Sequence, residues 1–116
     1  MSFNKVKSEL LKYKTLSHDW DSCGAFPPLT TVIESSVNML LLIQSLNLSL
    51  PIPSVNSLGH VSLYWETENL FIQILFEEPY SFTYVINING TVSGKDDYNF
   101  SSRLPNDLLN SLKSIS

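Results

Sequence analysis

Side chains with catalytic chemistry gather at one place, where His18, Asp19, Asp21 and Cys23 fall within six residues. A catalytic cysteine needs a base within hydrogen-bonding reach and donors for a developing oxyanion. Closeness along the chain does not supply that geometry, and a small thiol in a structural loop explains the same residues. We therefore assign no catalytic residue here.

The same four side chains lack the paired-ligand spacing of zinc sites. The sequence has only four glycines, and it contains no phosphate-binding loop, nucleophile elbow or dinucleotide fingerprint. We expect neither a metal nor a cofactor. The single cysteine, Cys23, excludes a disulfide within the chain and is typical of a cytoplasmic protein.

The elements that must position this loop form one α+β domain over residues 1–116. The composition, 43% hydrophobic and 16% charged, is typical of a globular protein. Residues 59–88 alternate in the two-residue period of strands and predict an antiparallel β-meander of three strands. Asn89-Gly90 is a hairpin signal that adds a short fourth strand near residues 91–93, followed by a loop over 94–103.

Three helices complete the predicted fold. Apolar residues at three- and four-residue spacing predict an N-terminal helix over residues 3–16, capped by Ser2. A long helix is expected to start at Thr30 or Thr31, where Thr31 and Glu34 have the spacing of a capping box. It is expected to reach Leu46 and to pack on one face of the sheet. Residues 47–57 are expected as a connection, and Pro105 opens a C-terminal helix.

The two faces of the meander differ in composition. One face is almost wholly apolar and is expected to face the core; it holds Val61, Leu63, Trp65, Leu70, Ile72, Ile74, Phe76, Phe82, Tyr84, Ile86 and Ile88. The other is mixed and is more apolar than water exposure favours. Either a helix or terminal segment covers it, or it is an interaction face. Its residues of interest are Tyr64, Phe71, Gln73, Leu75 and Val85.

The formal charge of −4 is unevenly distributed. Residues 60–100 hold six acids against Lys95, whereas Lys5, Lys7, Lys12 and Lys14 make the first helix basic. A nucleic-acid binder carries a concentrated basic face, so we expect no nucleic-acid partner. No apolar run reaches the length of a membrane span, and the charged start differs from a signal peptide, so we expect a cytoplasmic protein without membrane contact.

Two segments resemble a family of small, mostly uncharacterised prokaryotic proteins. Its members carry a Trp-Asp/Asn-Gly-x-Gly-Ala-x-Pro loop and, some forty residues on, a Gly-x-Ile/Val-x-Leu-Glu-Trp strand. The chain departs from this pattern at Ser22, where the family has Gly, and at Tyr64, where it has Glu. The resemblance implies an accessory or regulatory protein of mobile elements such as integron gene cassettes. The matching residues are Trp20, Asp21, Gly24, Ala25 and Pro27 in the loop, and Gly59, Val61, Leu63 and Trp65 in the strand.

We expect a small, non-catalytic interaction module that binds an unknown protein partner or forms a homodimer. One alternative is a small-molecule binder or weak enzyme that uses the 18–26 loop, with Trp20, Asp21, Cys23 and Trp65 as its site residues. In the loop, Trp20 and Phe26 are expected to be buried, Asp21 to accept backbone N–H groups, and Trp20 to pack on Trp65. A second alternative is an antitoxin or immunity protein.

Overall fold

A computed structural model describes residues 2–99 and 103–116 of the chain. Helices α1 (Phe3–Lys12) and α2 (Thr30–Ser45) come first, with a 3-10 turn η1 (Tyr13–Thr15) after α1. A five-stranded sheet and a last helix, α3 (Asn106–Ser114), follow. The strands are β1 (Ile52–Val55), β2 (Val61–Glu66), β3 (Leu70–Phe76), β4 (Ser81–Ile88) and β5 (Thr91–Asn99).

The sheet is an antiparallel meander in which each strand pairs with the one before it. This confirms the α+β class and the antiparallel meander. The predicted strand count is wrong, because the sheet has five strands rather than three or four.

The first strand, β1, lies in the stretch that the sequence predicted to be a connection. Pro53 obscured it, since proline cannot donate to a sheet ladder and lowers strand propensity. An edge strand tolerates proline, and β1 is an edge strand that pairs only with β2.

The last strand is also longer than predicted and runs to Asn99 instead of ending near residue 93. The expected loop over 94–103 is therefore wrong up to Asn99, and its residues 100–102 lie outside the described part of the chain. The pairing of β5 with β4 shifts register between Phe82 and Tyr84 of β4. At this shift Asp97 of β5 takes a φ of 50°. This is the geometry of a β-bulge, which bends an edge strand and interrupts its ladder.

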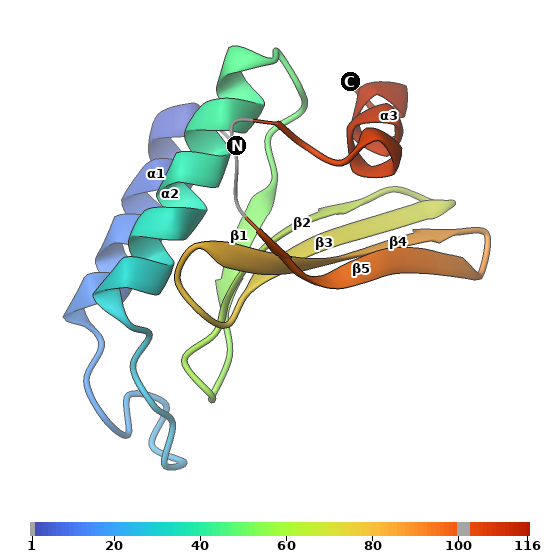
Figure 1. The fold of residues 1–116 in the computed structure, drawn as a ribbon. Helices are drawn as coiled ribbons and strands as arrows, with labels where there is room; N and C mark the ends of the chain where they lie inside the picture. The colour runs from blue at the N-terminus through green and yellow to red at the C-terminus, as the bar shows by residue number, and fades with distance from the viewer. Residues whose placement is uncertain (1, 100–102) are drawn as a thin grey trace.

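All three helices gather on one side of the sheet, and α1 lies beside α2 and next to β1 (Figure 1). The predicted core face turns toward them: Val61, Leu63, Ile72, Ile74 and Phe76 are fully buried, as predicted. Leu70 and Ile88, which pair at the strand ends, are the exceptions: Leu70 is partly buried, and Ile88 is 47% exposed.

The helix ends test two capping predictions. The Ser2 hydroxyl accepts the backbone N–H of Lys5 at 3.2 Å, which confirms the cap of α1. Helix α2 begins at Thr30, one of the two predicted starts, but the capping box predicted for Thr31 and Glu34 is wrong, because the cap position is Leu29, which has no side-chain oxygen. Burial of an apolar helix face can hold a helix without a cap, and α2 buries Val32, Ile33, Met39, Leu40 and Ile43.

Two tyrosine hydroxyls lie in the core between sheet and helices. Burial, together with the smaller effects of the negative charges of Glu9 and Tyr64, raises the pKa of Tyr13 to about 12. Burial also raises the pKa of Tyr84 to about 12, and its hydroxyl donates to Asp107 on α3 at 2.9 Å. The hydrogen bond between Tyr84 and Asp107 fixes α3 over β4.

Candidate interaction face and the loop at its edge

The sheet face that points away from the helices is the candidate functional surface, and we call it the open face. Tyr64, Phe71, Gln73, Leu75 and Val85 all lie on it, and each is partly exposed. In Figure 1 no helix lies on this side of the sheet. Within residues 2–99 and 103–116, the alternative that a helix or terminal segment covers the face is therefore wrong.

Cross-strand register arranges these residues in rows. The rings of Tyr64 and Phe71 lie 6.1 Å apart between centroids, so the two aromatic residues form one contact patch. The central row crosses every strand of the sheet and consists of Ile52, Tyr64, Gln73, Val85 and Gly94.

Sequence reasoning missed two apolar members of the open face. Ile52 of β1 is 44% exposed and pairs with Tyr64, while Val92 of β5 is 64% exposed and pairs with Asn87. The alternation of Ile52 and Ser54 was the available signal for the first of them.

The charge that strand register places on the open face is negative. Glu66 lies at the end of β2 opposite Phe71, and Asp97 lies beside Thr83, whose hydroxyl accepts its backbone N–H at 3.3 Å. Lys95 turns the other way, since it pairs with Tyr84 and its ammonium lies 5.6 Å from the ring centroid of Tyr98. None of the described strand positions on the open face carries Lys, Arg or His.

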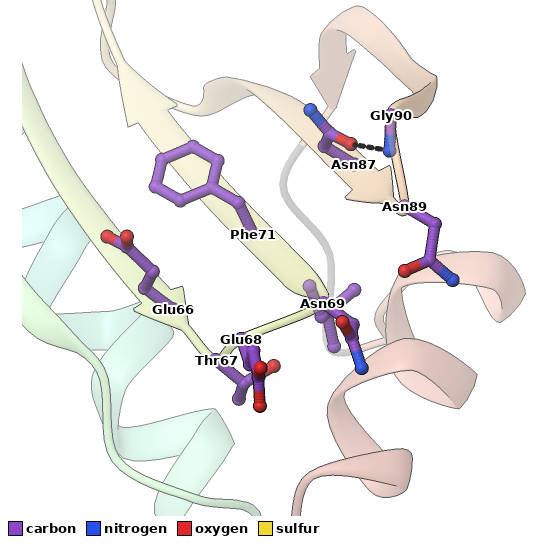
Figure 2. Close-up of a pocket in the computed structure, with 9 residues that line it drawn as sticks. Glu66, Thr67, Glu68, Asn69, Phe71, Asn87, Asn89 and Gly90 are labelled. Carbon is purple, nitrogen blue, oxygen red and sulfur yellow. Dashed lines mark hydrogen bonds between the residues drawn. The ribbon is translucent and has the colours of Figure 1, made fainter.

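A shallow polar hollow of about 240 Å³ continues the open face at the end where Glu66 lies. It sits between the β2–β3 and β4–β5 turns, and Figure 2 shows Glu66 and Phe71 at one side and the asparagines at the other. The Asn87 side-chain oxygen is already used, because it accepts the Gly90 N–H at 2.9 Å. The free acceptors are carboxylates and amide oxygens, which suit a cationic group.

The loop that holds the chemistry-bearing residues is closed by its own carboxylates. Asp21 accepts the backbone N–H groups of Cys23 at 2.8 Å and Ala25 at 3.1 Å, as predicted, and Asp19 accepts that of Gly24 at 2.6 Å. Gly24 has a φ of 82°, a conformation that favours glycine. Both carboxylates therefore act in holding the turn.

The loop does not assemble a nucleophile and base. The His18 ring lies against Phe26, with centroids 5.4 Å apart, and within the described residues no hydrogen bond joins it to the exposed thiol of Cys23. The prediction that Phe26 is buried is wrong, since it is 55% exposed; the neighbouring Ala25, at 1%, takes the interior position.

The loop is pressed against the turn between β1 and β2. Phe26 donates its N–H to the carbonyl of Ser57 at 2.9 Å. A Cβ at Gly59 would lie 2.7 Å from the Pro27 carbonyl oxygen, so only glycine allows this approach. The loop and strand segments named in the sequence resemblance thus meet at Gly59.

The two tryptophans are held by different segments. The indole of Trp20 donates to the Phe26 carbonyl at 2.8 Å, and that of Trp65 donates to the Ser49 carbonyl at 2.8 Å. Trp65 follows Gly59 by six residues, which is about 20 Å in extended chain. Within the described residues the two indoles make no ring contact, so the predicted packing of Trp20 on Trp65 is not observed.

A cleft of about 410 Å³ lies between the end of α1, the loop and β1. Of the four loop-site residues predicted from the sequence, only Trp20 lines it; Asp21, Cys23 and Trp65 do not. Its other walls come from Glu9, Lys12, Tyr13, Thr15, Leu16 and Val55.

Comparison with known proteins adds no relative: no family model, curated protein or solved structure matches the sequence. Among residues 2–99 and 103–116, no group of three or more His, Cys, Asp or Glu side chains is placed to hold a metal ion. In the same residues, no helix is both long enough and apolar enough to cross a membrane.

Proposed function

We propose that the chain is a small, non-catalytic protein-interaction module whose binding surface is the open face. The observation that carries this proposal is the partial exposure of Tyr64, Phe71, Leu75 and Val85 on a sheet face that no described helix covers. Exposed contiguous apolar patches are characteristic of interaction sites. Aromatic residues are also enriched where partner proteins bind.

The state of the loop supports the same proposal. Asp19 and Asp21 are occupied in closing the turn, and His18 packs on Phe26 rather than on the cysteine. The resemblance noted in the sequence supports an accessory or regulatory role on a mobile gene cassette. An antitoxin or immunity protein is a special case of such a module.

The test is affinity capture of the tagged chain from the lysate of its native host. We expect a stoichiometric protein partner to be recovered with the unaltered chain and with Leu58→Asp, and to be lost with Phe71→Asp. Leu58 is a matched control because it is 63% exposed in the β1–β2 turn, outside the open face. Recovery of the chain alone, of nucleic acid, or of a partner that Phe71→Asp retains would refute the proposal.

Small-molecule binding is a second candidate function, and the cleft beside Trp20 favours it. The cleft has apolar walls with a carboxylate and an ammonium group at Glu9 and Lys12. A thermal-shift screen would support this candidate if hits are lost with Trp20→Leu and retained with Phe71→Asp. Alkylation of Cys23 without any effect on such hits would exclude a role for the thiol.

A further inference from the structure

We propose that Asn89 is a site of spontaneous deamidation, where the chain converts its own asparagine to aspartate or isoaspartate, and that the side chain of Asn87 restrains this reaction. The reaction concerns the turn between β4 and β5. It depends neither on the open face nor on any partner.

Asn89 and Gly90 form the two-residue turn between β4 and β5. Ile88 pairs with Thr91 on either side of the turn, and the φ angles of Asn89 and Gly90 are 51° and 88°. Two positive φ angles are the mark of a type I′ turn, for which Asn-Gly is the preferred pair. Both turn residues are exposed, so water reaches them.

The chemistry needs only this pair of residues and water. The backbone nitrogen of Gly90 attacks the side-chain amide carbon of Asn89, a new C–N bond closes a succinimide ring, and the C–N bond of the amide breaks. The Gly90 N–H proton leaves with the amide nitrogen as ammonia. Water then opens the ring at either carbonyl and gives aspartate or isoaspartate. The net reaction takes up water and releases ammonia, without an oxidant or a reductant.

The residue after Asn89 leaves room for this ring. Asn89 is the only asparagine of the sequence that glycine follows. A side chain at the next position would crowd the closing ring, and glycine has no Cβ. Nothing lies within 4 Å of the position that a Cβ of Gly90 would take, so the fold adds no crowding of its own.

The Asn89 side chain is also free to move. Within the described residues no hydrogen bond engages its amide group, whereas the amide oxygen of Asn56 accepts two backbone N–H groups, each at 3.0 Å. Serine follows both Asn56 and Asn110, and Asn110 lies within α3. These two asparagines must break hydrogen bonds before their chain can close a ring. We therefore expect Asn89 to react ahead of them.

The Asn87 side chain holds the attacking nitrogen in place. Its amide oxygen accepts the Gly90 N–H at 2.9 Å, and Figure 2 shows this bond with the Asn89 side chain directed away from it. For the attack, the Asn89 side chain must rotate and the Gly90 N–H must release its proton. The bond to Asn87 opposes that release, because the hydrogen bond is lost with the proton. Asn87 is thus a positioning residue that slows the reaction.

The product changes the hollow that continues the open face. Glu66, Glu68 and Asn89 all line this hollow. A carboxylate at position 89 is ionised at neutral pH and joins the two already there. Isoaspartate also adds a carbon to the backbone of the two-residue turn, which disturbs the pairing of the strands beside it. The charge of the hollow therefore becomes more negative as the protein ages.

The test is incubation of the full chain in neutral buffer at physiological temperature, with peptide mapping by mass spectrometry at intervals. We expect the peptide that contains Asn89 to show conversion of an amide to an acid, with release of an equal amount of ammonia. An isoaspartyl methyltransferase should label the product, and Asn89→Gln should remove the labelled site. Peptides that contain Asn56 or Asn110 should react more slowly.

The variant Asn87→Val separates the restraint from the Asn-Gly pair. It removes the acceptor and keeps a residue that suits a strand, so deamidation at Asn89 should accelerate about two- to tenfold through the loss of one hydrogen bond. Hydrogen exchange of the Gly90 amide should accelerate with it. Ser93→Val is a matched control in the same hairpin, because Ser93 pairs with Ile86 and lies outside the turn; its deamidation rate should equal that of the unaltered chain. Far-UV circular dichroism checks that each variant is folded.

Two results would overturn the deamidation site: no conversion at Asn89 while a synthetic peptide of residues 85–93 converts fully in the same buffer, or faster conversion at Asn56 or Asn110. An unchanged or slower rate in Asn87→Val would overturn the restraint by Asn87.

Discussion

Replacing Gly59 with alanine tests the contact between the loop and the β1–β2 turn. Gly59 has a φ of 79°, and its added Cβ would lie 2.7 Å from the Pro27 carbonyl oxygen and 3.3 Å from that of Phe26. Gly24 is a matched control, since its φ is 82° and a Cβ there meets nothing within 4 Å.

The two substitutions share one energetic cost and differ in another. The left-handed conformation costs an alanine about 1 to 2 kcal/mol, offset by about 0.4 to 1 kcal/mol from the stiffer unfolded chain. Gly24→Ala should therefore lose about 1 kcal/mol of unfolding free energy. Overpacking against backbone atoms adds about 1 to 3 kcal/mol at Gly59, for a total of about 2 to 4 kcal/mol.

Urea unfolding followed by tryptophan fluorescence and far-UV circular dichroism measures both free energies. Trp20 gives a local readout, because its indole donates to the Phe26 carbonyl inside the loop. If Gly59→Ala costs no more than Gly24→Ala, the close approach of loop and turn is refuted.

Three further predictions concern other contacts. Asp21→Ala should cost about 1 to 2 kcal/mol of unfolding free energy through two lost hydrogen bonds, while Asp21→Asn, which keeps an acceptor, should cost less; equal losses in urea unfolding would contradict this. Trp65→Phe should cost about 2 kcal/mol in the same assay, because it leaves the Ser49 carbonyl without its donor; a change within error would show that this bond contributes nothing. The pKa of Tyr13 is 10.0 unfolded and about 12 folded, so the folded state holds its proton more tightly, and this stabilisation is complete below pH 10 and is lost as the pH rises toward 12. Melting curves from pH 8 to about 12 should show a shallower decline for Tyr13→Phe; parallel declines would contradict the assignment.

The core side of the sheet could be predicted because strand periodicity fixes which residues share a face. Leu63, Ile74 and Phe76 follow from that rule alone. The strands at the two edges could not be found in the same way, since Pro53, Gly94 and Asp97 all have low strand propensity. Edge strands and bulges accept such residues because one side of the ladder is unpaired.

The candidate site was predictable as a set of residues but not as an exposed surface. Alternation places Tyr64, Gln73 and Val85 on one face, whereas their exposure depends on all three helices packing on the other side. The 18–26 loop also has one feature that the sequence predicts and one that it does not. The carboxylate role of Asp21 follows from local turn chemistry. The position of Phe26 is not local in this sense, because its N–H donates to the carbonyl of Ser57, a residue distant in sequence.

The consecutive order of the five strands has a consequence for how the chain folds. Each pairing joins neighbours in the sequence through a short turn, so little loop-closure entropy opposes it. Low contact order of this kind is associated with fast folding. Among the described residues, the hydrogen bonds that Ser49 donates to Ile115 and Ser116, at 2.9 and 2.8 Å, join segments far apart in the sequence. We expect the meander to form early and the docking of α3 to complete the folding reaction.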